Sequence, residues 1–179
     1  MATAQMDWAS DLGDAIEEVN GGGFRPARHV LARFTALLYP LEVRHLDVNL
    51  RVVDQNRAKV SGTIVVFTDE LVAVATVQDM VAMTTHPSSD VHKTAKVDIS
   101  VVPRRALRRI DMPQVGAAGQ DVNDSLDWSI NSGELTEWAY TGQVALYYDG
   151  LEEAIHLPSG RNVEEFQAFL PSLLGNLIS

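Results

Sequence analysis

The sequence predicts an α+β fold that is built mainly from antiparallel strands and ends in a helix. Three observations lead to this prediction: apolar and polar residues alternate in runs between residues 45 and 101, Asp149-Gly150 joins two strand-like runs, and apolar residues recur at helical spacing over residues 163–177. The 179 residues show no repeat and no long linker, so we expect a single domain over residues 1–179. It would comprise a helical extension at 1–40 and a β-rich body at 41–179.

Two helices are expected before the first strand. Residues 7–19 have an apolar side and a largely acidic side, and the glycines at 21–23 end the helix. A second helix is expected over residues 26–39, with a proline at its start and another directly after it. Because the glycines make the first helix separable, we expect Trp8 and Leu12 to dock either on the chain's own strands or on a second copy.

A meander of strands should follow these helices. Three of its runs alternate between apolar and polar residues, which indicates one wet face; His45 and Asp47 would lie on the wet face of the first. The third run in chain order is so apolar that both of its faces should be covered, one of them by the second helix. The four runs are 45–53, 58–67, 71–77 and 97–101. Residues 112–124 should form a long surface loop, followed by a short strand over residues 125–130.

A hairpin is expected in the C-terminal third. A two-residue type I′ turn at Asp149-Gly150 would pair Leu146 with Glu153 and Val144 with Ile155. Glu153 would then lie on an otherwise apolar face.

The final helix has its own start and stop signals. Asn162 and Glu165 form a pair that resembles a capping box, and Pro171 should bend or restart the helix. The expected apolar stripe consists of Val163, Phe166, Leu170, Leu173 and Leu177.

Composition excludes several classes of function. A formal net charge of −10 repels phosphate backbones and disfavours general nucleic-acid binding. The absence of cysteine excludes disulfides, thiolate zinc sites and thiol nucleophiles, and makes a cytoplasmic location the default expectation. Neither a signal-peptide pattern nor a run of about 20 apolar residues occurs, so we expect no membrane insertion.

From residue 41 onward the order of elements resembles the pleckstrin-homology-like (PH-like) fold, particularly its bacterial members. The resemblance is carried by residues 62–71, 97–110 and 143–174. It implies a partly open barrel of two sheets capped by the C-terminal helix, with the two N-terminal helices as an addition. Proteins of this fold mostly bind phosphoinositides, phosphopeptides, proline-rich segments or other proteins. Phosphoinositide binders usually carry basic residues in the first hairpin loop, whereas residues 54–57 hold one arginine, which does not favour lipid binding.

The densest basic cluster consists of Arg104, Arg105, Arg108 and Arg109. On a helical turn these residues would share one side and grip a carboxylate or phosphate group of a partner. The alternative is an ordinary solvated or internally paired face, which is the more frequent explanation of such a cluster.

No other residues form a recognised catalytic or metal-binding pattern. His86 and His92 with Asp90, and the aspartates 121, 124 and 127, do not match the spacing of a zinc or calcium site. There is no nucleophile elbow and no glycine-rich phosphate loop. We therefore expect no catalytic residues, no cofactor and no bound metal.

These observations predict a non-enzymatic interaction module that binds a protein partner or a second copy of itself, through a groove between the last helix and the strands. The alternative is a small α+β enzyme or small-molecule carrier with an apolar pocket under a curled sheet. A cavity lined by His45, Asp47 or Glu153 would favour that alternative.

Overall fold

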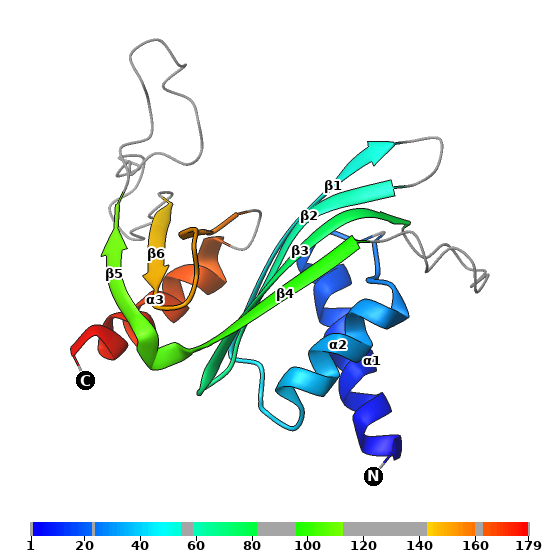
Figure 1. Cartoon of the computed structure of the whole chain (residues 1–179), viewed down its shortest axis with the longest axis horizontal. Helices are drawn as coiled ribbons and strands as arrows, with labels where there is room; N and C mark the ends of the chain where they lie inside the picture. Colours follow the sequence, from blue (N-terminus) through cyan, green and yellow to red (C-terminus); the bar gives the residue numbers. More distant parts are fainter. Residues whose placement is uncertain are drawn as a thin grey trace, which may run out of the picture. The chain divides into compact units, whose positions relative to one another are not determined.

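The computed structural model describes residues 2–22, 24–54, 59–81, 96–112, 143–159 and 163–178. They form an α+β structure with two open antiparallel sheets and a C-terminal helix, which confirms the predicted class (Figure 1). The chain folds as two compact units, residues 1–104 and 105–179. The N-terminal helices belong to the first unit together with the first four strands, so this division differs from the boundary at residue 40.

In its described residues, the first unit is a four-stranded meander preceded by two helices. Its elements are α1 (Ala2–Val19), α2 (Arg28–Leu38), β1 (His45–Asp54), β2 (Lys59–Phe67), β3 (Leu71–Val81) and β4 (Lys96–Pro103). The strands lie in the order β1-β2-β3-β4, each antiparallel to the next. A tight turn follows β2, in which the Thr68 hydroxyl accepts hydrogen bonds from the backbone N–H groups of Glu70 and Leu71.

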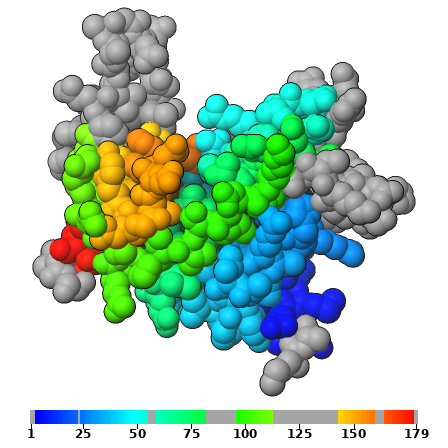
Figure 2. Space-filling model, in the orientation of Figure 1, coloured from blue at the N-terminus to red at the C-terminus, as the bar shows by residue number. Residues whose placement is uncertain are grey.

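Both helices cover the same face of this sheet (Figure 1). Leu12 and Ile16 of α1 and Phe34 of α2 are buried in one core with the inward-facing residues of β1, β2 and β3. Burying a large apolar side chain contributes about 1.5–3 kcal/mol, so these residues fasten both helices to the sheet. The atoms of α2 adjoin those of β4 in Figure 2, where Arg33 Nη1 donates to Val97 O over 2.6 Å. Leu12 therefore packs on the strands of its own chain.

The wet face predicted for β1 is wrong at the start of the strand. His45 and Asp47, expected on a wet face, are only 5% and 1% exposed. Their cross-strand neighbours Phe67 and Val65 are buried and apolar, so this end of the strand is covered on both sides. Burial on both faces, expected for β3, holds at its start, where the adjacent residues Val72 and Ala73 are both fully buried, but not at Thr76, which is exposed.

The second unit contains a three-stranded meander and the C-terminal helix. Its strands are β5 (Leu107–Asp111), β6 (Val144–Tyr148) and β7 (Ile155–Leu157), in the order β5-β6-β7. Helix α3 (Val163–Ile178) follows them.

The predicted pairing of this hairpin is wrong by two residues. Leu146 pairs with Ile155 and Val144 pairs with Leu157, because the connection continues beyond the Asp149-Gly150 turn. A shift of two preserves the faces of a strand, so the apolar side remains apolar. Glu153 lies exposed in the connection, which avoids placing a carboxylate on that side.

Helix α3 also differs in detail from its prediction. Among residues 164–177, Phe166, Phe169 and Leu173 are buried, whereas Leu177 is 38% exposed. The helix runs through Pro171 without a restart, and the buried residues on either side of the proline explain why one lost hydrogen bond is tolerated. The predicted cap at Asn162, the loop at 112–124 and the strand at 125–130 lie outside the described residues. Within the described ranges, the helices are too short or too polar to cross a membrane.

Candidate functional site

A groove in the first unit lies between α1 and the segment that joins α2 to β1. Its volume is about 420 Å³, within the usual range for ligand-binding clefts. It is lined by Trp8, Asp11, Leu12 and Ala15 of α1, and by Pro40, Leu41, Glu42 and Val43 of the joining segment. Trp8 and Leu12 are the residues that the sequence singled out for self-association, and the structure brings them to one site.

The wall formed by residues 40–43 is held in place along its length. The Leu41 N–H donates to Leu38 O over 2.7 Å, and the Arg44 N–H donates to Phe67 O over 2.7 Å. Between these anchors, the Trp8 indole N–H donates to the carbonyl oxygen of Leu41 over 3.1 Å. The groove is therefore formed before any partner arrives, which lowers the entropic cost of binding.

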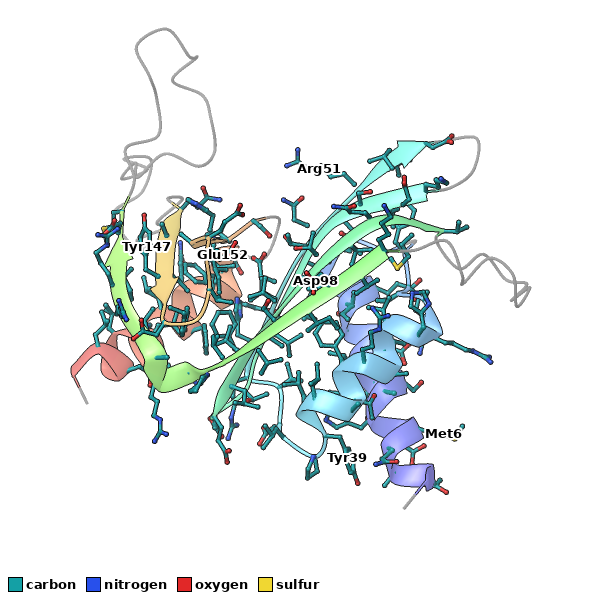
Figure 3. The ribbon with its side chains drawn as sticks, in the orientation of Figure 1. Met6, Tyr39, Arg51, Asp98, Tyr147 and Glu152 are labelled. Atoms are coloured by element: carbon teal, nitrogen blue, oxygen red, sulfur yellow. The ribbon has the colours of Figure 1, made fainter. Side chains whose placement is uncertain are left out.

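Aromatic packing fixes the other side of Trp8. Its ring meets Tyr39 edge to face, with centroids 6.4 Å apart and planes at 84°. This geometry is favourable for aromatic pairs and holds the indole in one orientation. Figure 3 shows Tyr39 at the end of α2 and Met6 on the first turns of α1, where the Met6 side chain is 71% exposed.

Helix α1 is clamped to the unit by Arg25. One guanidinium nitrogen donates to the carbonyl oxygen and hydroxyl of Ser10, each over 3.1 Å, and the other pairs with the Asp14 carboxylate. The guanidinium crosses the helix at Gly13, where an added Cβ would lie 3.0 Å from Leu31 Cδ1 and 3.1 Å from Arg25 Nε. The missing side chain at Gly13 makes room for this crossing, which fixes the helix wall of the groove.

The rim of the groove is acidic. Asp11 and Glu42 stand on opposite walls, and both are exposed. Glu42 pairs with Arg44 over 2.8 Å, whereas Asp11 forms no ion pair within the described part of the chain. Arg44 also binds Asp69 through two hydrogen bonds of 2.9 and 2.7 Å, and these lower the pKa of the Asp69 carboxyl below its ordinary value. The rim thus leaves negative charge available to a ligand.

The four arginines of the predicted anion-binding cluster have unequal environments. The predicted helical turn is confined to a short 3₁₀ turn over Arg104–Ala106, and Arg108 and Arg109 lie on strand β5. Arg104 is 5% exposed and donates from Nη1 to Thr68 O over 3.1 Å, so it supports the turn after β2. Arg105 is exposed.

The two arginines on β5 are engaged within the second unit. Arg108 pairs with Asp149 at the hairpin turn. Arg109 bonds to Asp111 over 3.1 Å and lies over the Tyr147 ring, 4.0 Å from its centroid. These pairings agree better with an internally paired face than with arginines that are free to bind a carboxylate or phosphate group of a partner.

The residues considered for catalysis or metal binding do not gather at the groove. His45 and Asp47 are buried on β1 and do not line it, and Asp98 and Glu153 are exposed elsewhere. Within the ranges that the structure describes, no three metal-ligating side chains cluster. The histidines at 86 and 92, Asp90, and the aspartates at 121, 124 and 127 lie outside those ranges.

Comparison with known proteins adds no relative: no protein-family model matches the chain, and no curated protein or solved structure is significantly similar to it. Function must therefore be argued from the groove itself. The sequence indicated Trp8 and Leu12 but not the opposite wall, because Pro40 was interpreted only as a helix stop. The run Leu41-Glu42-Val43, which alternates before the first strand, was the available signal.

Proposed function

We propose that the chain is a binding module that acts through protein–protein interaction at the groove beside Trp8. The observation that supports this proposal is the combination of a preformed apolar floor and an exposed acidic rim. The Trp8 N–H is already used inside the protein, so an incoming ligand gains most from apolar contact. Amphipathic aromatic residues in such preformed sites are frequent anchors of protein interfaces.

We also propose a PH-like arrangement for the strands and the final helix. Among the described residues, the strands of one antiparallel sheet are followed by those of a second and then by the terminal helix, which agrees with the two sheets and capping helix that the resemblance implies. The PH-like fold commonly serves binding, which agrees with the proposed activity, although fold alone does not specify function.

Site-specific photo-crosslinking tests the proposed function. A photoreactive amino acid is placed at position 11 or 42, which are exposed groove positions, and at position 36, which is exposed on α2 outside the groove. The variants are irradiated in the native host, and mass spectrometry identifies the adducts. We expect positions 11 and 42 to capture the same polypeptide and position 36 not to capture it.

Two results would contradict the proposed function. One is the absence of any polypeptide adduct at positions 11 and 42, and the other is the same set of adducts from all three positions. If the captured polypeptide is the chain itself, the module acts by self-association, which is the second form of the same proposal.

A further inference from the structure

We infer that the groove beside Trp8 accepts a segment of a partner protein in which a bulky apolar side chain is flanked by lysine or arginine. This inference rests on the proposed function and adds the chemistry of the partner. It follows from the charge of the groove walls and from the hydrogen bonds that already occupy backbone groups of the groove wall and of the outer strands.

The two charged residues that line the groove, Asp11 and Glu42, are both acidic. Helix α1 carries five carboxylates, at positions 7, 11, 14, 17 and 18, and no basic residue. Asp14 is occupied by Arg25 and Glu42 by Arg44, but Asp7 and Asp11 have no ion pair among the described residues. Asp7 and Asp11 are one helical turn apart and therefore neighbours. A cation on the ligand would meet these carboxylates while its apolar neighbour enters the groove beside Trp8.

Side chains of the partner, rather than its backbone, must provide the specificity. The Leu41 carbonyl on the groove wall already accepts the Trp8 N–H, which removes one acceptor that an added strand would use. The outer strands of the sheet are engaged as well. Asn20 Oδ1 accepts the Leu50 N–H on β1 over 3.3 Å, and Arg33 binds the Val97 carbonyl on β4. These occupied backbone groups disfavour binding of a partner as an added strand. They favour a partner that inserts one apolar side chain into the groove and places a flanking cation at the rim.

Selection from a random nine-residue peptide display library tests the inference. The target is the full chain, alongside a charge-reversed variant, D11K/E42K. A matched control, E152K/E153K, makes the same change in net charge at exposed positions of the second unit. All four substituted residues are exposed, so we expect unchanged melting temperatures.

The wild-type chain and the control should enrich peptides that carry lysine or arginine within two residues of a bulky apolar residue. Binding of those peptides to D11K/E42K, measured by calorimetry, should be weaker by roughly tenfold, or about 1.4 kcal/mol, because reversing the rim charges replaces attraction of the peptide's cation by repulsion. The same peptides should bind the wild type less tightly as salt is added.

The outcomes distinguish failure of the charge inference from failure of the proposed function. If neutral or acidic apolar peptides are enriched and bind wild type and D11K/E42K equally, the charge inference is overturned while the interaction module stands. If no enriched peptide loses affinity when A15W fills the groove, the proposed function fails as well. If light scattering shows a wild-type dimer that D11K/E42K dissociates, the occupant is a second copy and the inference is overturned.

Discussion

Gly62 on β2 provides the sharpest test of the strand arrangement. Its φ is +150°, a conformation that side-chain-bearing residues rarely adopt, and it lies where the pairing of β2 with β3 shifts register. A Cβ added there would lie 1.8 Å from the carbonyl oxygen of Asn49 and 3.1 Å from Leu50 Cα. Both atoms belong to the backbone of β1, so no side chain can rotate out of the way. Gly62→Ala must therefore push β1 away from β2.

The expected cost has two parts. The backbone conformation alone costs about 1–3 kcal/mol for a residue with a side chain. Separating the strands locally weakens one or two backbone hydrogen bonds, each contributing about 0.5–1.5 kcal/mol. We expect Gly62→Ala to lower the free energy of unfolding by about 1.5–6 kcal/mol, a large part of the stability of a typical domain.

Two other glycines serve as matched controls. Gly22 has φ +80° with nothing within 4 Å of an added Cβ, so Gly22→Ala carries conformational strain without a clash and should cost about 1 kcal/mol. Gly175 lies within α3 with open space around it, so Gly175→Ala should stabilise that helix by about 0.5–1 kcal/mol. Urea unfolding followed by circular dichroism measures all three. If Gly62→Ala costs no more than Gly22→Ala, β1 and β2 are not paired as described.

Three further predictions concern the first unit. Phe34→Ala should lower the free energy of unfolding by about 3–5 kcal/mol, because it leaves a cavity at a fully buried site; a loss below about 1 kcal/mol in urea unfolding would contradict the packing of α2 on the sheet. The lowered pKa of Asp69 means that its pair with Arg44 stabilises the fold above the ordinary aspartate pKa, and that this contribution is lost as the pH falls through the lowered value. Unfolding of Asp69→Asn should accordingly depend less on pH across the acid range and less on salt, and an unchanged acid profile would count against the pair. Arg25→Ala should raise the rate of amide hydrogen exchange in α1 without raising that of β2 and β3, whereas unchanged exchange in α1 would show that the clamp is unnecessary.

The sequence was informative wherever one local pattern decides the outcome. Alternation located β1, β2 and β4, and the acidic amphipathic pattern located α1 with Trp8 and Leu12 on its packed side, whereas β5 was not predicted as a strand. The pairing of β6 with β7 was missed because a favoured turn dipeptide specifies where a chain reverses but not how long the connection continues. The burial of Asp47 was missed for a similar reason, since the alternation along β1 does not reveal which cross-strand neighbours cover each face.

The candidate site could likewise be predicted only where a local pattern in the sequence determines the structure. One wall was foreseen because it lies on a helix with a readable period. The other wall, Pro40 to Val43, has no regular secondary structure, and its position depends on hydrogen bonds to residues distant in the chain. The arginine cluster was visible as a run of charge, yet the burial of Arg104 and the stacking of Arg109 depend on partners that only folding brings near.

The side chains of Asn20 and Arg33 also have a consequence for the solubility of the protein. Asn20 binds the N–H group of Leu50 on β1, and Arg33 binds the carbonyl oxygen of Val97 on β4. Outer strands with unpaired backbone groups can pair with strands of other molecules, which leads to fibrous aggregates. Asn20 follows α1 directly and Arg33 lies on α2, so the helical layer that shields the apolar face also guards both margins of the sheet. A chain shortened to begin at β1 would lose both protections together, and we expect it to aggregate at concentrations where the 179-residue chain stays dispersed.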